Sequence, residues 1–256
     1  MDGDRELKIL NWLTPIDYGP QQSDFIQKRQ EGTGTWLLHT NEFKTWFQQK
    51  EKTLFCPGIP GAGKTILAAI VIDHLYNQCA KYPATGLAYV YCNFRRQHEQ
   101  KPEDLLSSLL KQFSQEQPSL PKSVNTLYEY HNRKRTRPSF NEIEEALCSV
   151  AADYSRAFIV VDALDECSVS EGGRQKVLSV IFNLQAKTGA NLFATSRING
   201  DITKLFEGAL SLQIRATNKD IERYLDEQMR LLESDILDDK LRRTIKREVI
   251  KAADGM

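Results

Sequence analysis

The chain has 256 residues, of which 41% are hydrophobic, and this is enough to bury one large core. Its 34 basic and 34 acidic residues give a formal net charge of +0, so no overall charge favours phosphate backbones, and the sequence predicts no nucleic-acid partner. Because no apolar run approaches the roughly 20 residues that span a bilayer, and the N-terminus MDGDRELK is too charged for a signal peptide, we predict a soluble, cytoplasmic protein with no membrane partner.

The chain divides by composition into a leader and a core. Residues 1–30 mix charges with Pro15, Gly19 and Pro20, and their apolar positions are too few for a separate core. We therefore expect this leader to pack on the main body. The core is predicted to span residues 31–215, and it opens with a glycine turn at 32–34 and a helix that carries large apolar groups from Trp36 to Phe47.

Strands and helices are predicted to alternate through the core. Strands are expected at 53–56, 86–94, 158–164, 191–196 and 210–214, and helices at 66–76, 102–113, 141–152 and 176–186. Pro102 suits the first position of its helix, Ser139 or Asn141 could cap the next, and the prolines at 118, 121 and 138 indicate a polar connection between these two helices. The alternation predicts an α/β, three-layer fold, whose mostly parallel sheet of about five strands lies between helices. Together with the phosphate-loop pattern at residues 58–65, it predicts the P-loop NTPase fold.

Residues 216–256 have a different, densely charged composition. Apolar residues recur there at the spacing of amphipathic helices, at Leu231, Leu232, Ile236, Leu237, Leu241 and Ile245. We interpret this part as the beginning of a helical subdomain that is truncated here.

The segment GIPGAGKT, from Gly58 to Thr65, matches the phosphate-loop pattern GxxxxGK[ST] at every fixed position. Glycines let the backbone curl so that successive N–H groups point at a phosphate, and the following helix adds its positive N-terminal end. Lys64 would supply a point charge for the β- and γ-phosphates, and the Thr65 hydroxyl would bind magnesium. The predicted nucleotide-binding residues are Gly58, Pro60, Gly61, Ala62, Gly63, Lys64, Thr65 and Ile66.

An acidic cluster follows the buried strand FIVVD. A P-loop enzyme needs a second strand, next to the first, that ends in a carboxylate directed at magnesium, and Asp162 occupies that position. Asp165 and Glu166 extend the cluster into DALDE, where one of them could orient the water that attacks the γ-phosphate. The strand NLFATS is followed by Arg197, a cation at the carboxyl edge of the sheet that could stabilise the γ-phosphate. We thus predict Lys64, Asp165, Glu166 and Arg197 as catalytic residues and Thr65 and Asp162 as magnesium ligands.

These motifs together resemble the NACHT family of STAND nucleotide-dependent switches. The resemblance rests on GIPGAGKT, on DALDE with the small Ala163 after Asp162, and on TSR at the end of the next strand. The phrases NWLTPIDY, GTGTWLLHTNEF, YCNF and IRATNKDIERYL resemble the NACHT modules of fungal multidomain proteins, the nephrocystin-like type often joined to ankyrin repeats. The likeness covers nearly the whole chain.

The resemblance implies roles for individual residues. Gly58, Gly63, Lys64 and Thr65 would hold phosphate and magnesium, Asp162 would be the metal-side acid, Asp165 the water-orienting base with Glu166 assisting, and Arg197 the sensor arginine. It also implies a slow hydrolase that acts as a switch, forms a homo-oligomer on activation, and signals in self/non-self recognition or cell death. A family member would continue into a winged helix and then repeat domains, so we expect a fragment or a short relative.

Several alternatives stay open at this stage. The chain could be a small-molecule kinase, or a scaffold that binds nucleotide without hydrolysing it. The bound pair would be ATP/ADP or GTP/GDP with Mg²⁺, and we favour ATP; base contacts are expected around Arg29 to Thr35. TNKD, residues 217–220, differs from the guanine-reading NKxD and is interpreted as a helix cap, and the basic run at 131–137 as a solvated loop.

The cysteines give no sign of a metal site or a redox pair. Cys56, Cys79, Cys92, Cys148 and Cys167 are widely scattered and never show the CxxC spacing. We therefore expect buried free thiols in a reducing compartment.

Overall fold

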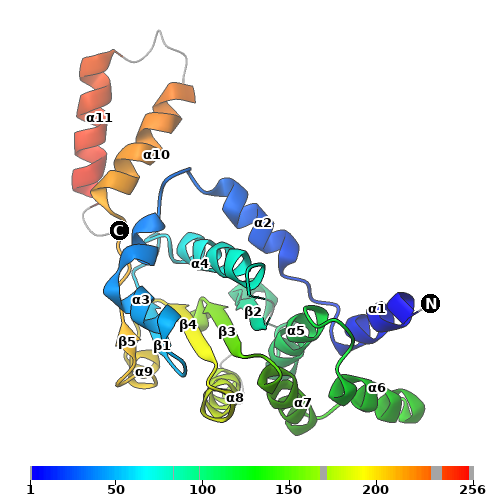
Figure 1. The fold of residues 1–256 in the computed structure, drawn as a ribbon. Coiled ribbons are helices and arrows are strands. Elements are labelled where there is room, and N and C mark those ends of the chain that lie inside the picture. The colour runs from blue at the N-terminus through cyan, green and yellow to red at the C-terminus, as the bar shows by residue number, and fades with distance from the viewer. Residues whose placement is uncertain (1, 83, 98, 168–171, 232–237, 254–256) are drawn as a thin grey trace.

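The computed structural model describes residues 2–82, 84–97, 99–167, 172–231 and 238–253. Within these residues, five parallel strands form one sheet of order β2-β3-β4-β1-β5 (Figure 1). The strands are β1 (Thr53–Pro57), β2 (Thr85–Tyr91), β3 (Arg156–Asp162), β4 (Asn191–Ser196) and β5 (Leu210–Ser211). The predicted α/β fold with a parallel central sheet is confirmed.

Helices cover both faces of this sheet. Helix α4 (Lys64–Cys79) lies on one face, whereas α5 (Pro102–Gln115), α7 (Phe140–Ala152) and α8 (Gly173–Thr188) pack together on the other (Figure 1). The strands between them are buried on both sides, and every residue of β2 and β4 is buried. This explains why the strands read as continuous apolar runs instead of alternating ones.

The ends of two of these helices agree with their predicted signals. Pro102 is the first residue of α5, where its missing N–H costs nothing. The Ser139 side chain caps α7 and accepts a hydrogen bond from the backbone N–H of Glu142. The Glu142 carboxylate in turn accepts from the N–H of Ser139, which completes a capping box.

The N-terminal residues form two helices against the core, α1 (Asp2–Leu13) and α2 (Gly19–Lys28). Ile9, Leu10 and Leu13 of α1 are buried. In α2, the buried Gln22 donates a hydrogen bond of 3.0 Å to the carbonyl of Ala69 in α4. The segment therefore shares the hydrophobic core of the sheet.

Three local predictions are wrong. The expected polar connection contains α6 (Lys122–Lys134), whose buried Val124, Tyr128 and His131 recur at helical spacing; the prolines flank this helix instead of excluding it. The ring of His131 is hydrogen-bonded to Thr136 and Glu142, so the basic run is not simply a solvated loop. Strand β5 is shorter than expected, and Ile214 forms only an isolated bridge with Gly58.

The remaining short elements connect the sheet to its surroundings. They are η1 (Thr35–His39), α3 (Asn41–Gln48), η2 (Phe94–Arg96), η3 (Leu164–Glu166) and α9 (Gly200–Lys204).

Helices α10 (Asn218–Leu231) and α11 (Asp239–Ala252) form a hairpin that projects from the body beside η1 (Figure 1). Of the predicted amphipathic positions, Leu232, Ile236 and Leu237 lie outside the described residues. None of the helices in the described ranges combines the length and the apolar character that crossing a membrane requires.

Candidate functional site

The phosphate loop connects β1 to α4, whose first backbone N–H groups have no acceptor within the helix itself. Gly61 and Gly63 have φ angles of 82° and 86°, a left-handed conformation in which side chains are strained. A Cβ at Gly58 would lie 2.7 Å from the carbonyl oxygen of Ile214, so only glycine fits where this backbone passes. The loop is therefore shaped as an anion-binding turn at a helix N-terminus.

The Lys64 side chain folds back over this loop. Its Nζ donates hydrogen bonds of 2.9 Å to the carbonyl oxygens of Gly58 and Ile59. Burial lowers the pKa of Lys64, while the nearby Asp165 and Asp162 act in the opposite direction. The ammonium group thus lies inside the loop, where it can exchange two carbonyls for phosphate oxygens.

Asp162, the last residue of β3, is 3% exposed and bonded on both oxygens. The Thr65 hydroxyl donates to its Oδ2 at 2.8 Å, and the Thr195 hydroxyl donates to its Oδ1 at 2.6 Å. Burial raises the pKa of Asp162, and the two hydroxyls oppose this shift. A carboxylate and a hydroxyl at this distance fit Mg²⁺, which prefers oxygen ligands and completes its shell with waters and phosphates.

We expected β3, which ends at Asp162, to lie next to β1, but it does not. Strand β4 lies between β1 and β3, and pairs with both. Asp162 still contacts Thr65 because α4 begins above this edge of the sheet, and the intervening strand contributes Thr195. Sequence reasoning missed Thr195, although it stands in the TSR segment that drew attention to Arg197.

Asp165, Glu166 and Arg197 form a second group, which is more exposed than Asp162. Asp165 accepts a hydrogen bond of 2.8 Å from the backbone N–H of Arg197 and pairs with its guanidinium at 3.1 Å. The guanidinium also lies 3.5 Å from the Glu166 carboxylate. The structure thus brings all the predicted catalytic side chains to one edge of the sheet, with Lys64 electrostatically coupled to this group.

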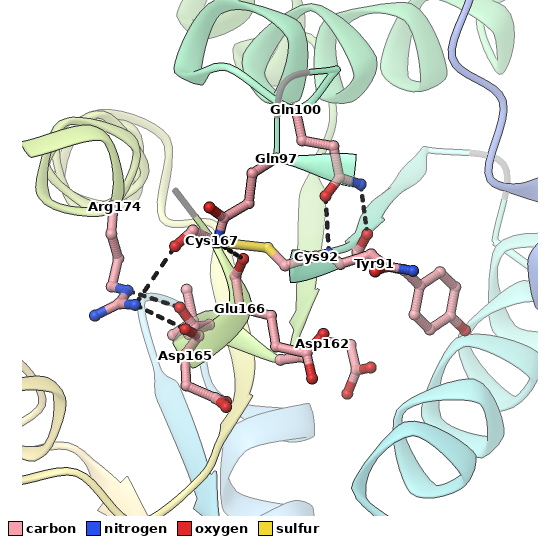
Figure 2. Close-up of a disulfide and its surroundings, with 12 residues drawn as sticks. Tyr91, Cys92, Gln97, Gln100, Asp162, Asp165, Glu166, Cys167 and Arg174 are labelled. Carbon is pink, nitrogen blue, oxygen red and sulfur yellow. Dashed lines mark hydrogen bonds between the residues drawn. A yellow bond between two sulfur atoms is a disulfide. The ribbon is translucent and has the colours of Figure 1, made fainter. Parts of the chain in front are cut away.

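Arg174 of α8 holds the backbone of the acid segment (Figure 2). Its guanidinium donates to the carbonyls of Leu164, at 2.7 Å, and of Asp165, at 2.9 Å. Ala163 has a φ of 58°, an unfavourable conformation for a residue with a side chain, which turns the chain from β3 into η3. No pattern in the sequence indicates Arg174, because a buried arginine looks like a surface one.

The expectation of five free thiols is wrong for one pair. Cys92 and Cys167 form a disulfide across 75 residues of sequence (Figure 2). They are distant in sequence, but they follow the ends of β2 and β3, which are adjacent parallel strands. In the described part of the chain the free cysteines are Cys56, Cys79 and Cys148, of which only Cys56 is fully buried.

A cavity of about 350 Å³ adjoins the phosphate loop. Gly61 to Gly63 form part of its wall, the predicted base-contact segment contributes Arg29, Thr33 and Gly34, and α10 contributes Ile221 and Tyr224. Asp220 also lines it, and its carboxylate accepts a hydrogen bond of 3.2 Å from the N–H of Gly34. Thr217 accepts from the N–H of Asp220, as expected of a helix cap.

Comparisons with known proteins agree with this geometry. The family model described as Nephrocystin 3, N-terminal matches residues 32–197. The vegetative incompatibility protein HET-E-1 of Podospora anserina is 24% identical over 139 residues, which are 52% of this chain and 10% of that protein.

Two solved structures share the fold. The Aeropyrum pernix ORC1 protein in complex with DNA matches 95% of this chain and 58% of its own, with a TM-score of 0.53 and 16% identity. The Aeropyrum pernix ORC2 protein, in ADPNP and ADP complexes, matches 89% and 57% with a TM-score of 0.50 and 11% identity. This chain thus spans little more than half of these structures and a tenth of the curated relative.

One prediction is overturned by these comparisons. We had excluded nucleic acid as a partner on the basis of a balanced net charge, but a protein with this fold, ORC1, is in complex with DNA. Net charge averages over the whole surface, so it does not exclude a local site for an anionic polymer.

The phosphate loop, the acid at the end of β3 and the match over residues 32–197 lead to one assignment. The chain belongs to the nephrocystin 3 N-terminal family, and the resemblance to the NACHT family of STAND P-loop NTPases is confirmed.

Proposed function

We propose that this chain is the Mg²⁺-dependent nucleotide switch of a signalling protein and that it hydrolyses ATP slowly. The observation that carries the proposal is the hydrogen bond between Thr65 and Asp162, because it joins the phosphate loop to the acid of β3. A magnesium ion replacing that bond would have one ligand from each element. Its remaining positions would be filled by water and by phosphate oxygens.

The catalytic step is in-line attack of water on the γ-phosphate. Lys64 neutralises the phosphate oxygens after leaving the carbonyls of Gly58 and Ile59. Asp165 orients the attacking water, and Glu166 assists from the same segment. Arg197 then stabilises the charge that develops on the transferred group, a role that suits its position against both carboxylates.

The nucleotide base occupies the cavity beside the loop. Its walls combine apolar groups from Trp36, Ile66 and Ile221 with the polar segment at 28–34. We favour adenine because the ORC2 protein, whose fold is similar, is in complexes with ADPNP and ADP. Residues of α10 and Val249 of α11 also line the cavity. Exchange of the bound nucleotide would therefore shift the position of these two helices.

The signalling role is proposed from the relatives. The similarity to a vegetative incompatibility protein supports a function in self/non-self recognition or cell death in a fungus. On this proposal the module acts in the cytoplasm, within a longer protein with effector and ankyrin-type repeat domains, and forms a homo-oligomer in the triphosphate state.

The test is to identify the nucleotide that co-purifies with the chain and with its Lys64→Ala variant. We expect ADP or ATP in the parent and at least about tenfold lower occupancy in the variant, because a phosphate loop without its lysine loses the main charge on the β- and γ-phosphates. The matched control is Lys81→Ala, which removes an exposed lysine just after the same helix and should leave occupancy unchanged. Equal occupancy in all three proteins would contradict the proposal.

Single-turnover kinetics with bound ATP then separates the rivals. Release of inorganic phosphate supports the hydrolase. Transfer of phosphate to an added small molecule would identify a kinase, and bound ATP that persists unchanged would identify a scaffold.

A further inference from the structure

The disulfide between Cys92 and Cys167 joins the two loops that flank the acid cluster. Cys92 directly follows β2, and Cys167 directly follows η3, which carries Asp165 and Glu166. Their Cα atoms are 5.2 Å apart, within the usual range for a disulfide, and the residues are 6% and 2% exposed. The bond therefore links two loops at the carboxyl edge of the sheet, beside the candidate catalytic residues.

Glu166 depends on the loop that this disulfide holds (Figure 2). Its backbone carbonyl accepts a hydrogen bond of 3.0 Å from the Gln97 side chain. Its carboxylate accepts from the backbone N–H of Phe94 at 3.3 Å. Both donors belong to the segment that begins at Cys92, so this segment fixes both the backbone and the carboxylate of Glu166.

Asp165 is anchored by residues outside the loop after β2, one of which, Arg174, also donates to the carbonyl of Cys167 at 3.4 Å. Its carboxylate is bonded to the N–H of Arg197, which follows β4, and its carbonyl accepts from Arg174 of α8. Neither partner belongs to the loop after β2. Breaking the disulfide should therefore loosen Glu166 and leave Asp165 in place.

The size of the core argues against a purely stabilising role for the bond. Disulfides are indispensable mainly in small domains that cannot build a core, whereas this chain buries all of β2 and β4 and much of α4. The other thiols are poor competitors for exchange, because burial raises the pKa of Cys79 to about 11 and also raises that of Cys148.

We propose that Cys92 and Cys167 form a reversible thiol–disulfide site that fixes the position of Glu166 and thereby sets the rate of nucleotide hydrolysis. The reductant is a dithiol. One of its thiolates attacks a sulfur of the pair and forms a mixed disulfide, and its second thiol then displaces the protein sulfur. Two electrons and two protons pass to the protein, which leaves Cys92 and Cys167 as thiols and the reductant as a disulfide. The kinetic part of this inference rests on the proposed function.

The first measurement counts thiols by alkylation of the denatured chain and mass spectrometry. We expect three reactive thiols in the chain purified without reductant, which are Cys56, Cys79 and Cys148. After treatment with a dithiol, all five cysteines should react. Five reactive thiols before treatment would overturn the inference.

The second measurement is hydrogen exchange of the same folded chain before and after reduction. Amides at 93–97 and 166–167 should exchange faster once the bond is broken, and those of Asp165 and of the phosphate loop should not change. The double variant with Cys92→Ser and Cys167→Ser should behave like the reduced chain. Cys148→Ser, which removes a half-buried thiol elsewhere, should behave like the oxidised parent.

The third measurement is hydrolysis under the same conditions. Reduction should lower kcat about threefold to tenfold at unchanged nucleotide affinity, because a displaced Glu166 no longer supports the water held by Asp165. Reoxidation should restore the rate, and the double variant should not respond. Identical exchange and identical rates in the oxidised and reduced chains would overturn the inference. Faster exchange without hydrolysis in either state would support the disulfide's hold on Glu166 and contradict the proposed hydrolase.

Discussion

Asp162 and Asp165 belong to the same short segment, DALDE, yet they are held by different means. Asp162 is the last residue of a buried strand, and its oxygens are fixed by hydroxyl groups of α4 and β4. Asp165 lies on a short 3₁₀ turn, and its carboxylate is fixed by Arg197, whose side chain is 51% exposed. The proposed magnesium side of the site is therefore fixed by buried regular structure, whereas the proposed water side depends on loops and exposed ion pairs.

This difference separates two properties of the site. Groups fixed by buried regular structure keep their geometry when the surface changes, because moving them would disrupt close packing. Exposed ion pairs contribute little to stability and can rearrange at small cost. We therefore expect the capacity to bind nucleotide to be robust and the rate of hydrolysis to be adjustable.

The largest effect should follow from Asp162→Asn. The amide cannot supply the negative charge that magnesium requires, so we expect hydrolysis to fall by about 100-fold or more. Single-turnover hydrolysis and the magnesium dependence of ATP affinity would measure this loss. Asp153→Asn, at an exposed helix end, is the matched control. A variant that retains magnesium-dependent hydrolysis would show that Asp162 is not the metal-side acid.

A smaller effect is expected from Arg197→Ala. The variant should bind ADP normally and hydrolyse ATP about 10- to 100-fold more slowly, because the arginine acts on charge that develops at the γ-phosphate. Arg197→Lys should recover only part of the rate, since an ammonium lacks the fork that contacts Asp165 and Glu166 together. Equal losses of ADP and ATP affinity in the alanine variant would instead indicate a structural role.

The Asp162 side of the site could also be predicted from the sequence more fully than the Asp165 side. The phosphate loop, Asp162 and the parallel sheet were accessible because each depends on a local pattern: a glycine spacing, an apolar run or an alternation of elements. The order of the strands was not, and so Thr195 on the intervening strand β4 was missed.

The surroundings of Asp165 and Glu166, the proposed water side, were harder to predict from the sequence for the same reason. Arg174 and the Cys92–Cys167 pair act between segments that meet only in the folded chain, and no spacing in the sequence marks such a meeting. The segment at 29–35, which is predicted to contact the base, lines the cavity beside the phosphate loop, but no pattern in the sequence indicates that Asp220 of α10 bonds to it.

The smallest expected effect is on the free energy of unfolding, and it tests whether the buried Asp162 carboxylate destabilises the folded chain. Burial raises the pKa of Asp162 above the ordinary 3.8, so the folded chain holds its proton more readily than the unfolded chain does. The stability linked to this proton is present below pH 3.8 and is lost as the pH rises through the elevated folded pKa. An amide at this position carries no charge at any pH, so Asp162→Asn should stabilise the nucleotide-free chain at neutral pH by about 0.5 to 2 kcal/mol. Denaturant unfolding of both proteins across this range should show a gap that widens as the pH rises. A variant less stable than the parent at neutral pH would mean that the hydrogen bonds from Thr65 and Thr195 outweigh the cost of burying the charge.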